Sequence, residues 1–285
     1  MQLNQLLQLA GVDPTKTLVL RHAPNAKEFR TVFTALAREQ PTLFNAYQRM
    51  QGEKVSRAMR RAQYVASFIA LRDNRAVFVG LYEVKGYQCE TLDKIMSYDG
   101  VKELTDLGMA VKRRQQFWHD LEPTDLLAPF RFSLTLRWPE PAISWYRWAH
   151  KNTFEILPSP IGPEVGTDMP DWRLLNLKWG QLKSMPPSWQ ASLKHWRGIY
   201  YIFDTSVRKG YVGSAYGKTN ILGRWLEYAK TGHGGNVRLR RRNPKNFQFS
   251  ILERVSPDME QSDVVQLETT WKARLHTKEY GLNDN

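Results

Sequence analysis

The sequence contains very little cysteine and no long apolar run. Cys89 is the single cysteine among 285 residues, which excludes an intramolecular disulfide and a cysteine-rich zinc site. One cysteine is compatible with a reducing compartment, so we expect a cytoplasmic protein. No apolar stretch is long enough to cross a bilayer, and we identify neither a signal peptide nor a basic amphipathic helix. We therefore expect no membrane partner.

Acidic residues are also scarce. The chain has 28 Asp and Glu residues against 41 Lys and Arg residues, for a net charge of +13. Such an excess favours a polyanionic partner. The sequence contains no helix-turn-helix or zinc-finger pattern, no internal repeat and no low-complexity tract. Its length allows two domains, each with its own core.

Two tyrosine motifs lie close together in the last third of the chain. Gly198-Ile199-Tyr200 and then Tyr211-Val212-Gly213 predict two neighbouring short strands. The following segment predicts a helix that places Arg224 and Tyr228 four residues apart on one face. The pattern therefore gathers phenols and a guanidinium group in a short length of chain.

A second helical stretch carries Glu268, and the chain closes on Tyr280-Gly281-Leu282-Asn283. The order Tyr, Tyr, Arg, Tyr, Glu, Asn resembles the GIY-YIG endonuclease superfamily, and the resemblance covers residues 196–285. It implies a small domain with a three-stranded antiparallel sheet flanked by helices. The positions that match the superfamily's catalytic set are Tyr200, Tyr211, Arg224, Tyr228 and Asn283, and Glu268 matches its metal-binding glutamate.

The chain departs from the superfamily's pattern at two places. Val212 stands where isoleucine is usual, and residues 215–220 lengthen the gap between the second motif and Arg224. The longer gap bears on the local geometry of Arg224.

The residue types suit phosphodiester hydrolysis. A planar, permanently charged guanidinium such as that of Arg224 can bind two phosphate oxygens at once. A tyrosine activates water only if a nearby cation lowers its pKa, and either Tyr200 or Tyr211 is a candidate base. Because Glu268 is the one acidic residue that we assign to a metal, we expect a single Mg²⁺ or Mn²⁺ ion.

Each of these residues also has an ordinary structural explanation. The two tyrosines fit a hydrophobic core, and Arg224 and Tyr228 fit a stacked surface pair. Glu268 fits a solvated helix position that interacts with Lys272 four residues later.

Basic residues are concentrated in two segments. We expect both to contact phosphates of double-stranded DNA, although charge runs are commonly solvated faces. The candidate DNA-binding residues are Arg238, Arg240, Arg241, Arg242 and Lys245, with Arg57, Arg60 and Arg61 in the first half of the chain.

The first half predicts an α+β domain or a partly open barrel. Residues 25–39 have helical spacing, and strands are expected at 64–71, 76–85, 130–138 and 153–157. The glycine-containing strand pair loosely resembles PUA-like domains, the group that includes the EVE and SRA readers of modified bases. That resemblance implies an aromatic pocket for an extruded base. Its candidate residues are Tyr82, Trp138, Trp145 and Trp148, each of which also fits a core or an interface.

The predicted organisation is an α+β chain with three parts. Residues 1–157 form a DNA-recognition domain, 158–195 a proline- and glycine-rich linker, and 196–285 the nuclease domain. We expect a magnesium-dependent restriction endonuclease, modification-dependent if the PUA-like resemblance holds, and a homodimer on DNA for a double-strand break. The alternatives are a structure-specific repair or recombination nuclease and a non-catalytic DNA-binding protein.

Overall fold

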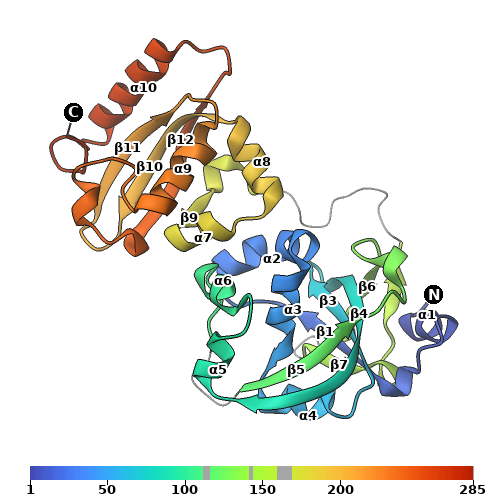
Figure 1. Cartoon of the computed structure of the whole chain (residues 1–285). Helices are drawn as coiled ribbons and strands as arrows, with labels where there is room; N and C mark the ends of the chain where they lie inside the picture. Colours follow the sequence, from blue (N-terminus) through green and yellow to red (C-terminus); the bar gives the residue numbers. More distant parts are fainter. Residues whose placement is uncertain (112–115, 141–143, 159–168, 285) are drawn as a thin grey trace. The chain divides into compact units, whose positions relative to one another are not determined.

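The computed structural model describes residues 1–111, 116–140, 144–158 and 169–284. The chain divides into two compact units, Met1–Thr167 and Asp168–Asn285 (Figure 1). Both combine helices with a sheet, so the predicted α+β class is confirmed. None of the described helices is long and apolar enough to cross a membrane.

The amino-terminal unit is built on a curled, mixed sheet of eight strands in the order β2-β5-β4-β3-β1-β7, with β6 and β8 continuing from β4. Its β1 and β3 are parallel, and the other pairs are antiparallel. The strands are β1 (Thr17–His22), β2 (Met50–Gln51), β3 (Tyr64–Ala70), β4 (Arg75–Glu90), β5 (Gln116–Pro123), β6 (Thr135–Arg137), β7 (Tyr146–Trp148) and β8 (Glu155–Leu157).

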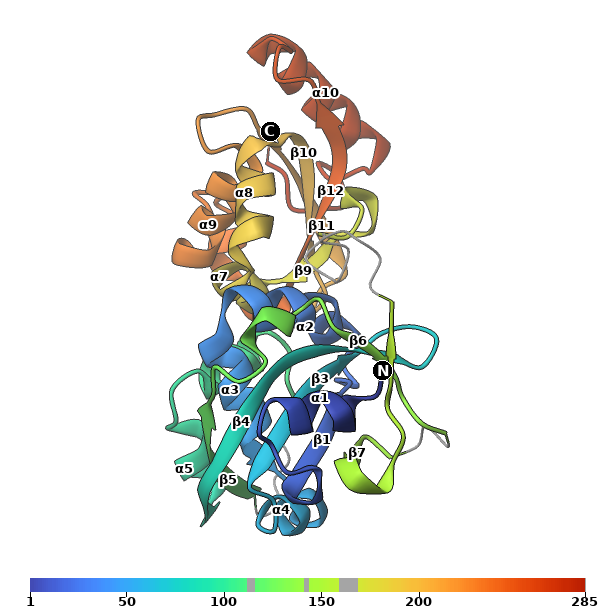
Figure 2. The same cartoon turned by 90° about the vertical axis from the view of Figure 1, so that its right-hand side faces the viewer.

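The curl of this sheet follows from the length of β4. The strand pairs with β3 and β6 near its start and with β5 near its end, and a register shift interrupts both the β3 and the β5 ladder. Such irregularities bend a strand and increase its twist. Figure 2 shows β4 and β5 curving along their length. This half-barrel is consistent with the PUA-like arrangement expected from the sequence.

Short helices accompany the sheet of this unit. They are α1 (Leu3–Leu9), α2 (Lys27–Glu39), α3 (Pro41–Arg49), α4 (Glu53–Met59), α5 (Leu92–Met96) and α6 (Val101–Asp106). The helix expected at 25–39 is α2. The strand expected at 130–138 is shorter than predicted, because a 3₁₀ turn ends at Phe130 and Phe132 has φ 58°.

The two faces of β1 belong to two different apolar clusters. Val19 packs into the cluster that contains Leu3 and Leu7 of α1. Because side chains alternate along a strand, His22 lies on the opposite face. There its ring contacts Phe33 of α2 and Phe44 of α3.

The carboxy-terminal unit contains a four-stranded antiparallel sheet in the order β11-β10-β12-β9. The strands are β9 (Asn176–Lys178), β10 (Arg197–Asp204), β11 (Lys209–Ala215) and β12 (Phe247–Val255). The prediction of three strands missed β9, a three-residue strand that pairs with β12 from within the expected linker.

Four helices flank this sheet: α7 (Trp179–Ser184), α8 (Pro187–His195), α9 (Asn220–Thr231) and α10 (Gln261–Arg274). Of the segment 158–195 expected as a linker, α7 and α8 pack against α9, and residues 159–168 lie outside the described residues. One face of β10 and β11 is covered by α10, through a cluster of Ile199, Val212 and Val264. On the other face Trp225 of α9 contacts Phe249.

Candidate active site

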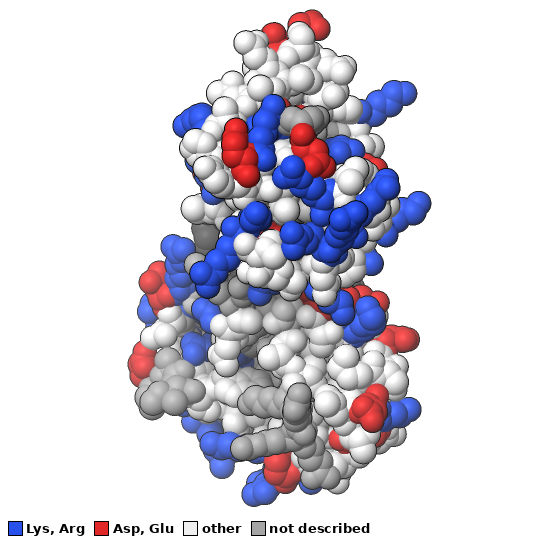
Figure 3. Space-filling view, turned by 90° about the vertical axis from the view of Figure 1, so that its left-hand side faces the viewer, with Lys and Arg blue, Asp and Glu red and all other residues white. Residues whose placement is uncertain are grey.

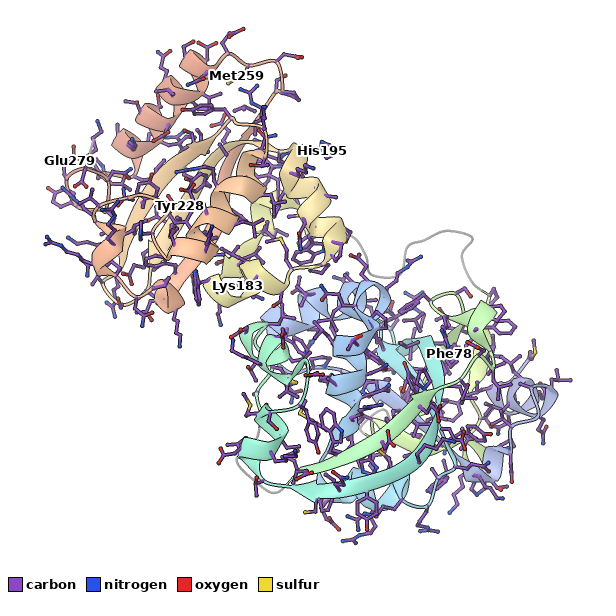
Figure 4. All side chains as sticks on the ribbon, viewed as in Figure 1. Phe78, Lys183, His195, Tyr228, Met259 and Glu279 are labelled. Carbon is purple, nitrogen blue, oxygen red and sulfur yellow. The ribbon has the colours of Figure 1, made fainter. Side chains whose placement is uncertain are left out.

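The structure gathers three of the predicted tyrosines beneath α9. Tyr200 and Tyr211 project from β10 and β11, and Tyr228 projects from α9. The hydroxyl oxygens of Tyr200 and Tyr228 are 3.3 Å apart. The ring of Tyr228 lies 6.1 Å from that of Tyr200 and 6.4 Å from that of Tyr211. Figure 4 shows Tyr228 between α9 and the sheet.

Strand pairing explains why both motif tyrosines lie on this face. Tyr200 is directly opposite Gly213, and Tyr211 is opposite Ile202. Directly opposed residues share a face of the sheet. The alternating residues Ile199 and Val212 consequently face α10.

The motif glycines make room for the site. A Cβ atom on Gly213 would overlap the hydroxyl end of Tyr200, and one on Gly198 would overlap the carbonyl group of Glu253. Gly198 also has φ +154°, which side-chain-bearing residues rarely adopt. On α9's far side, a Cβ on Gly234 would approach the ring of Tyr228 to 2.6 Å. These glycines are required by close packing rather than by a turn.

Burial keeps two of the phenols protonated. Tyr200 and Tyr228 are fully buried, and this burial raises the pKa of both hydroxyls well above the ordinary value. Both therefore act as hydrogen-bond donors and acceptors at neutral pH. Tyr211 is half-buried, so it is the motif phenol that solvent can reach.

Arg224 lies against this cluster. Its guanidinium group hydrogen-bonds to the Tyr200 hydroxyl, is 5.8 Å from the Tyr228 ring centre, and pairs with Glu227 at 2.8 Å. Burial lowers its pKa, but the Tyr200 and Tyr228 hydroxyls and Glu227 outweigh this effect and raise it. The side chain remains 38% exposed, so its charge is available to an anion in solvent.

Glu268 occupies the other face of the sheet. It projects from α10, accepts a hydrogen bond from Ser214 of β11 and pairs with Lys272 at 2.8 Å. The Glu268 and Lys272 side chains are only 16% and 7% exposed. Within the described residues no hydrogen bond links Glu268 to a phenol. The carboxylate is thus next to β11, three residues from Tyr211, or about 10 Å along the strand.

Asn283 holds the strand that carries Tyr211. Its side-chain oxygen accepts a hydrogen bond from the Val212 N–H at 2.9 Å, and its NH₂ group donates to the Val212 carbonyl at 2.8 Å. The Leu282 N–H donates to the Gly210 carbonyl. The carboxy-terminal segment therefore pairs with the outer edge of β11. Asn283 is a positioning residue.

The donors around Glu268 are compatible with one hard cation. No group of three or more His, Cys, Asp or Glu side chains occurs among the described residues. One carboxylate completed by water and substrate oxygens is a common way to hold Mg²⁺. Glu268 is the residue that would contribute this carboxylate, and Lys272 is the cation with which the metal would compete.

The predicted DNA-binding residues differ in their surroundings. Arg240, Arg241 and Lys245 are exposed and Arg242 is half-buried, whereas Arg238 pairs with Asp284. In the amino-terminal unit, Arg57 and Arg60 pair with Glu53, and Arg61 lies 5.9 Å from the Trp148 ring. Figure 3 shows lysine and arginine side chains gathered on one face of the carboxy-terminal unit.

The four aromatic residues expected to form a base pocket do not come together. Tyr82 and Trp138 are buried, and Trp148 is half-buried. Trp145 alone of the four lines a cavity of about 540 Å³, together with His22 and Tyr47. Sequence reasoning missed these two residues, since a single histidine at a strand end gives no periodic signal.

Comparison with known proteins finds similarity in the carboxy-terminal part of the chain. No protein-family model matches the chain, and neither does any curated protein. One similar solved structure is the catalytic domain of the homing endonuclease I-TevI, at 29% identity over 31% of this chain and 98% of that one, with a TM-score of 0.27. A mutant of the catalytic domain of the intron endonuclease I-TevI is similar over 32% of this chain and 94% of that one, also at 29% identity and a TM-score of 0.27.

Proposed function

We propose that the protein is a metal-dependent endonuclease that hydrolyses phosphodiester bonds of double-stranded DNA. The observation that carries the proposal is the position of Arg224, a half-exposed guanidinium held by the buried Tyr200 hydroxyl. A planar cation fixed in this way is suited to stabilise charge that develops on a phosphoryl group.

The three phenols have different roles in this proposal. Tyr211 takes the proton from the attacking water, because it is the half-buried phenol of the cluster. Tyr200 and Tyr228 keep their protons and orient Arg224. Glu268 holds one Mg²⁺ or Mn²⁺ ion, which supplies Lewis-acid stabilisation of the phosphate when bound.

The biological setting that fits this chemistry is restriction of foreign DNA in the cytoplasm. The amino-terminal unit would recognise the DNA, in a modification-dependent manner, and deliver it to the nuclease. One such site cuts one strand at a time, so a double-strand break requires a homodimer on DNA or two successive nicks.

Nicking of supercoiled plasmid in Mg²⁺ tests the proposal. Glu268→Ala and Arg224→Ala should each slow nicking by about a hundredfold or more, while Glu279→Ala, at an exposed position, should not. Glu268 and Arg224 lie on opposite faces of the sheet, so the double variant tests whether they serve one phosphate. If they do, it should be no slower than the worse single variant.

The same experiment separates the alternatives. Nicking that persists in Glu268→Ala, or in excess chelator, contradicts the metal assignment. DNA binding with no nicking by the unaltered protein indicates a DNA-binding protein without catalysis. Preference for branched over linear duplex would favour a structure-specific repair nuclease.

A further inference from the structure

The cavity of about 540 Å³ in the amino-terminal unit has the features of a built ligand site. Its size falls within the range of about 300–1,000 Å³ that is typical of small-molecule pockets. Its walls come from the end of β1, from α2 and α3, from β2, and from the segment after α6. The residues that matter here are His22, Phe29, Tyr47, Gln51 and Trp145.

His22 is a buried polar group that lacks a partner. It is 2% exposed, and among the described residues its Nε2 atom has no hydrogen-bond partner. Its ring centre lies 5.5 Å from that of Tyr47 and 6.2 Å from that of Trp145. Leaving a buried polar atom unpaired costs about 1–3 kcal/mol. A ligand that hydrogen-bonds to Nε2 would remove this cost.

Gln51 presents a second polar group to the same cavity. The side chain is 4% exposed, and its NH₂ group donates to the Gln48 carbonyl at 2.7 Å. This bond fixes the amide plane. Gln51 can therefore offer a hydrogen bond in a defined direction, as a site that reads the edge of a ligand requires.

The rest of the wall favours an uncharged, flat ligand. Phe29 and Tyr47 pack with ring centres 5.7 Å apart, and Trp145 is 36% exposed. Aromatic side chains with a free face stack on heteroaromatic rings. The lining residues in the described part of the chain include no carboxylate, so the cavity is not suited to a cation.

We infer that this cavity receives one nucleobase extruded from duplex DNA, stacked by Tyr47 and Trp145 and read along its edge by His22 and Gln51. The inference rests on the proposed function, since a DNA-cutting chain makes a base the flat ring at hand. It replaces three of the four residues expected from the sequence and retains Trp145. Enzymes that read a single base in this way extrude it from the stack, at a cost of a few kcal/mol.

Binding by a non-cutting protein tests the inference. The full chain carrying Glu268→Ala is titrated with labelled duplexes whose central pair is matched, mismatched, 5-methylcytosine–guanine or 5-hydroxymethylcytosine–guanine. A mismatch lowers the cost of extrusion, so the mismatched duplex should bind about tenfold more tightly than the matched one. Adding Tyr47→Ala should abolish that ratio. Adding Phe130→Ala, at a 37% exposed aromatic residue outside the cavity, should preserve it.

Two results would overturn the inference: equal affinity for matched and mismatched duplexes, or a ratio that survives Tyr47→Ala. Trp145→Ala provides a second variant at a more exposed position, in case Tyr47→Ala does not fold. The affinities of the two modified duplexes show whether the pocket also reads cytosine modification. Plasmid nicking by the same pocket variants with Glu268 intact keeps the outcomes separable, because nicking can persist when the pocket hypothesis fails.

Discussion

At the scale of single residues, burial gives chemically similar side chains different tasks. Tyr200 and Tyr211 belong to matching motifs, but only Tyr200 is fully buried. Desolvation disfavours the charged phenolate. The half-buried Tyr211 is for that reason the better proton acceptor.

This difference predicts unequal effects of removing the two hydroxyls. Tyr211→Phe should slow plasmid nicking by about 10²–10⁴-fold, the usual contribution of a general base. Tyr200→Phe should have a smaller effect, because it removes a hydrogen bond to Arg224 rather than the base. Nicking rates at saturating DNA measure both. A larger loss in Tyr200→Phe would reverse the assignment.

His22 predicts a pH dependence of stability. Burial lowers the pKa of His22 to about 3, from an ordinary value near 6.5. Between these values the unfolded chain binds a proton that the folded chain does not, so stability is lost as pH falls through this window. The loss is on the order of 4 kcal/mol by pH 3, at about 1.4 kcal/mol per unit.

Urea unfolding between pH 7 and pH 4 measures this dependence. His22→Phe should flatten it, since phenylalanine does not titrate. His233→Phe, at a half-buried loop position of the carboxy-terminal unit, serves as the matched control and should leave the slope unchanged. An unchanged slope in His22→Phe would contradict the role given to His22.

At the scale of elements, the site depends on how β11 is held. The strand is an edge of its sheet, and the carboxy-terminal segment pairs with the outer side through Asn283 and Leu282. An edge without such pairing leaves backbone groups unsatisfied. The position of Tyr211 therefore depends on a residue more than seventy positions away in the sequence.

Asn283→Ala tests this pairing. It leaves the buried Val212 N–H and carbonyl unpaired, and the free energy of unfolding of the carboxy-terminal unit should fall by about 1–3 kcal/mol for each group. Asn283→Asp keeps the acceptor and loses the donor, so its effect on unfolding should also be destabilising. Urea unfolding of the full chain measures both, and no change in either variant would remove the positioning role.

At the scale of the whole molecule, the excess of positive charge is not uniformly available. Arg240 and Arg241 are exposed, whereas Arg57 is held 3.2 Å from Glu53. A cation that is already paired must break that pair to bind phosphate. The two basic segments predicted from the sequence therefore have unequal potential to contact DNA.

Salt dependence of DNA binding distinguishes them. Each phosphate contact lowers the slope of log K against log salt by about 0.9. Arg240→Ala and Arg241→Ala should each reduce the slope by about that amount, and Arg57→Ala by less. Equal slopes for all three variants would show that the exposed arginines do not contact phosphate.

The sequence by itself determined the α+β class, the tyrosine strands and the helix with Arg224 and Tyr228, because these depend on local spacing and on period-two and period-3.6 patterns. Only the tertiary structure decided that β9 joins the sheet, that Glu268 lies across the sheet from the phenols, and that His22, Tyr47 and Trp145 share a cavity. Each of these facts joins segments far apart in the chain. Such contacts are fixed by strand pairing and helix packing, which leave no periodic mark in the sequence.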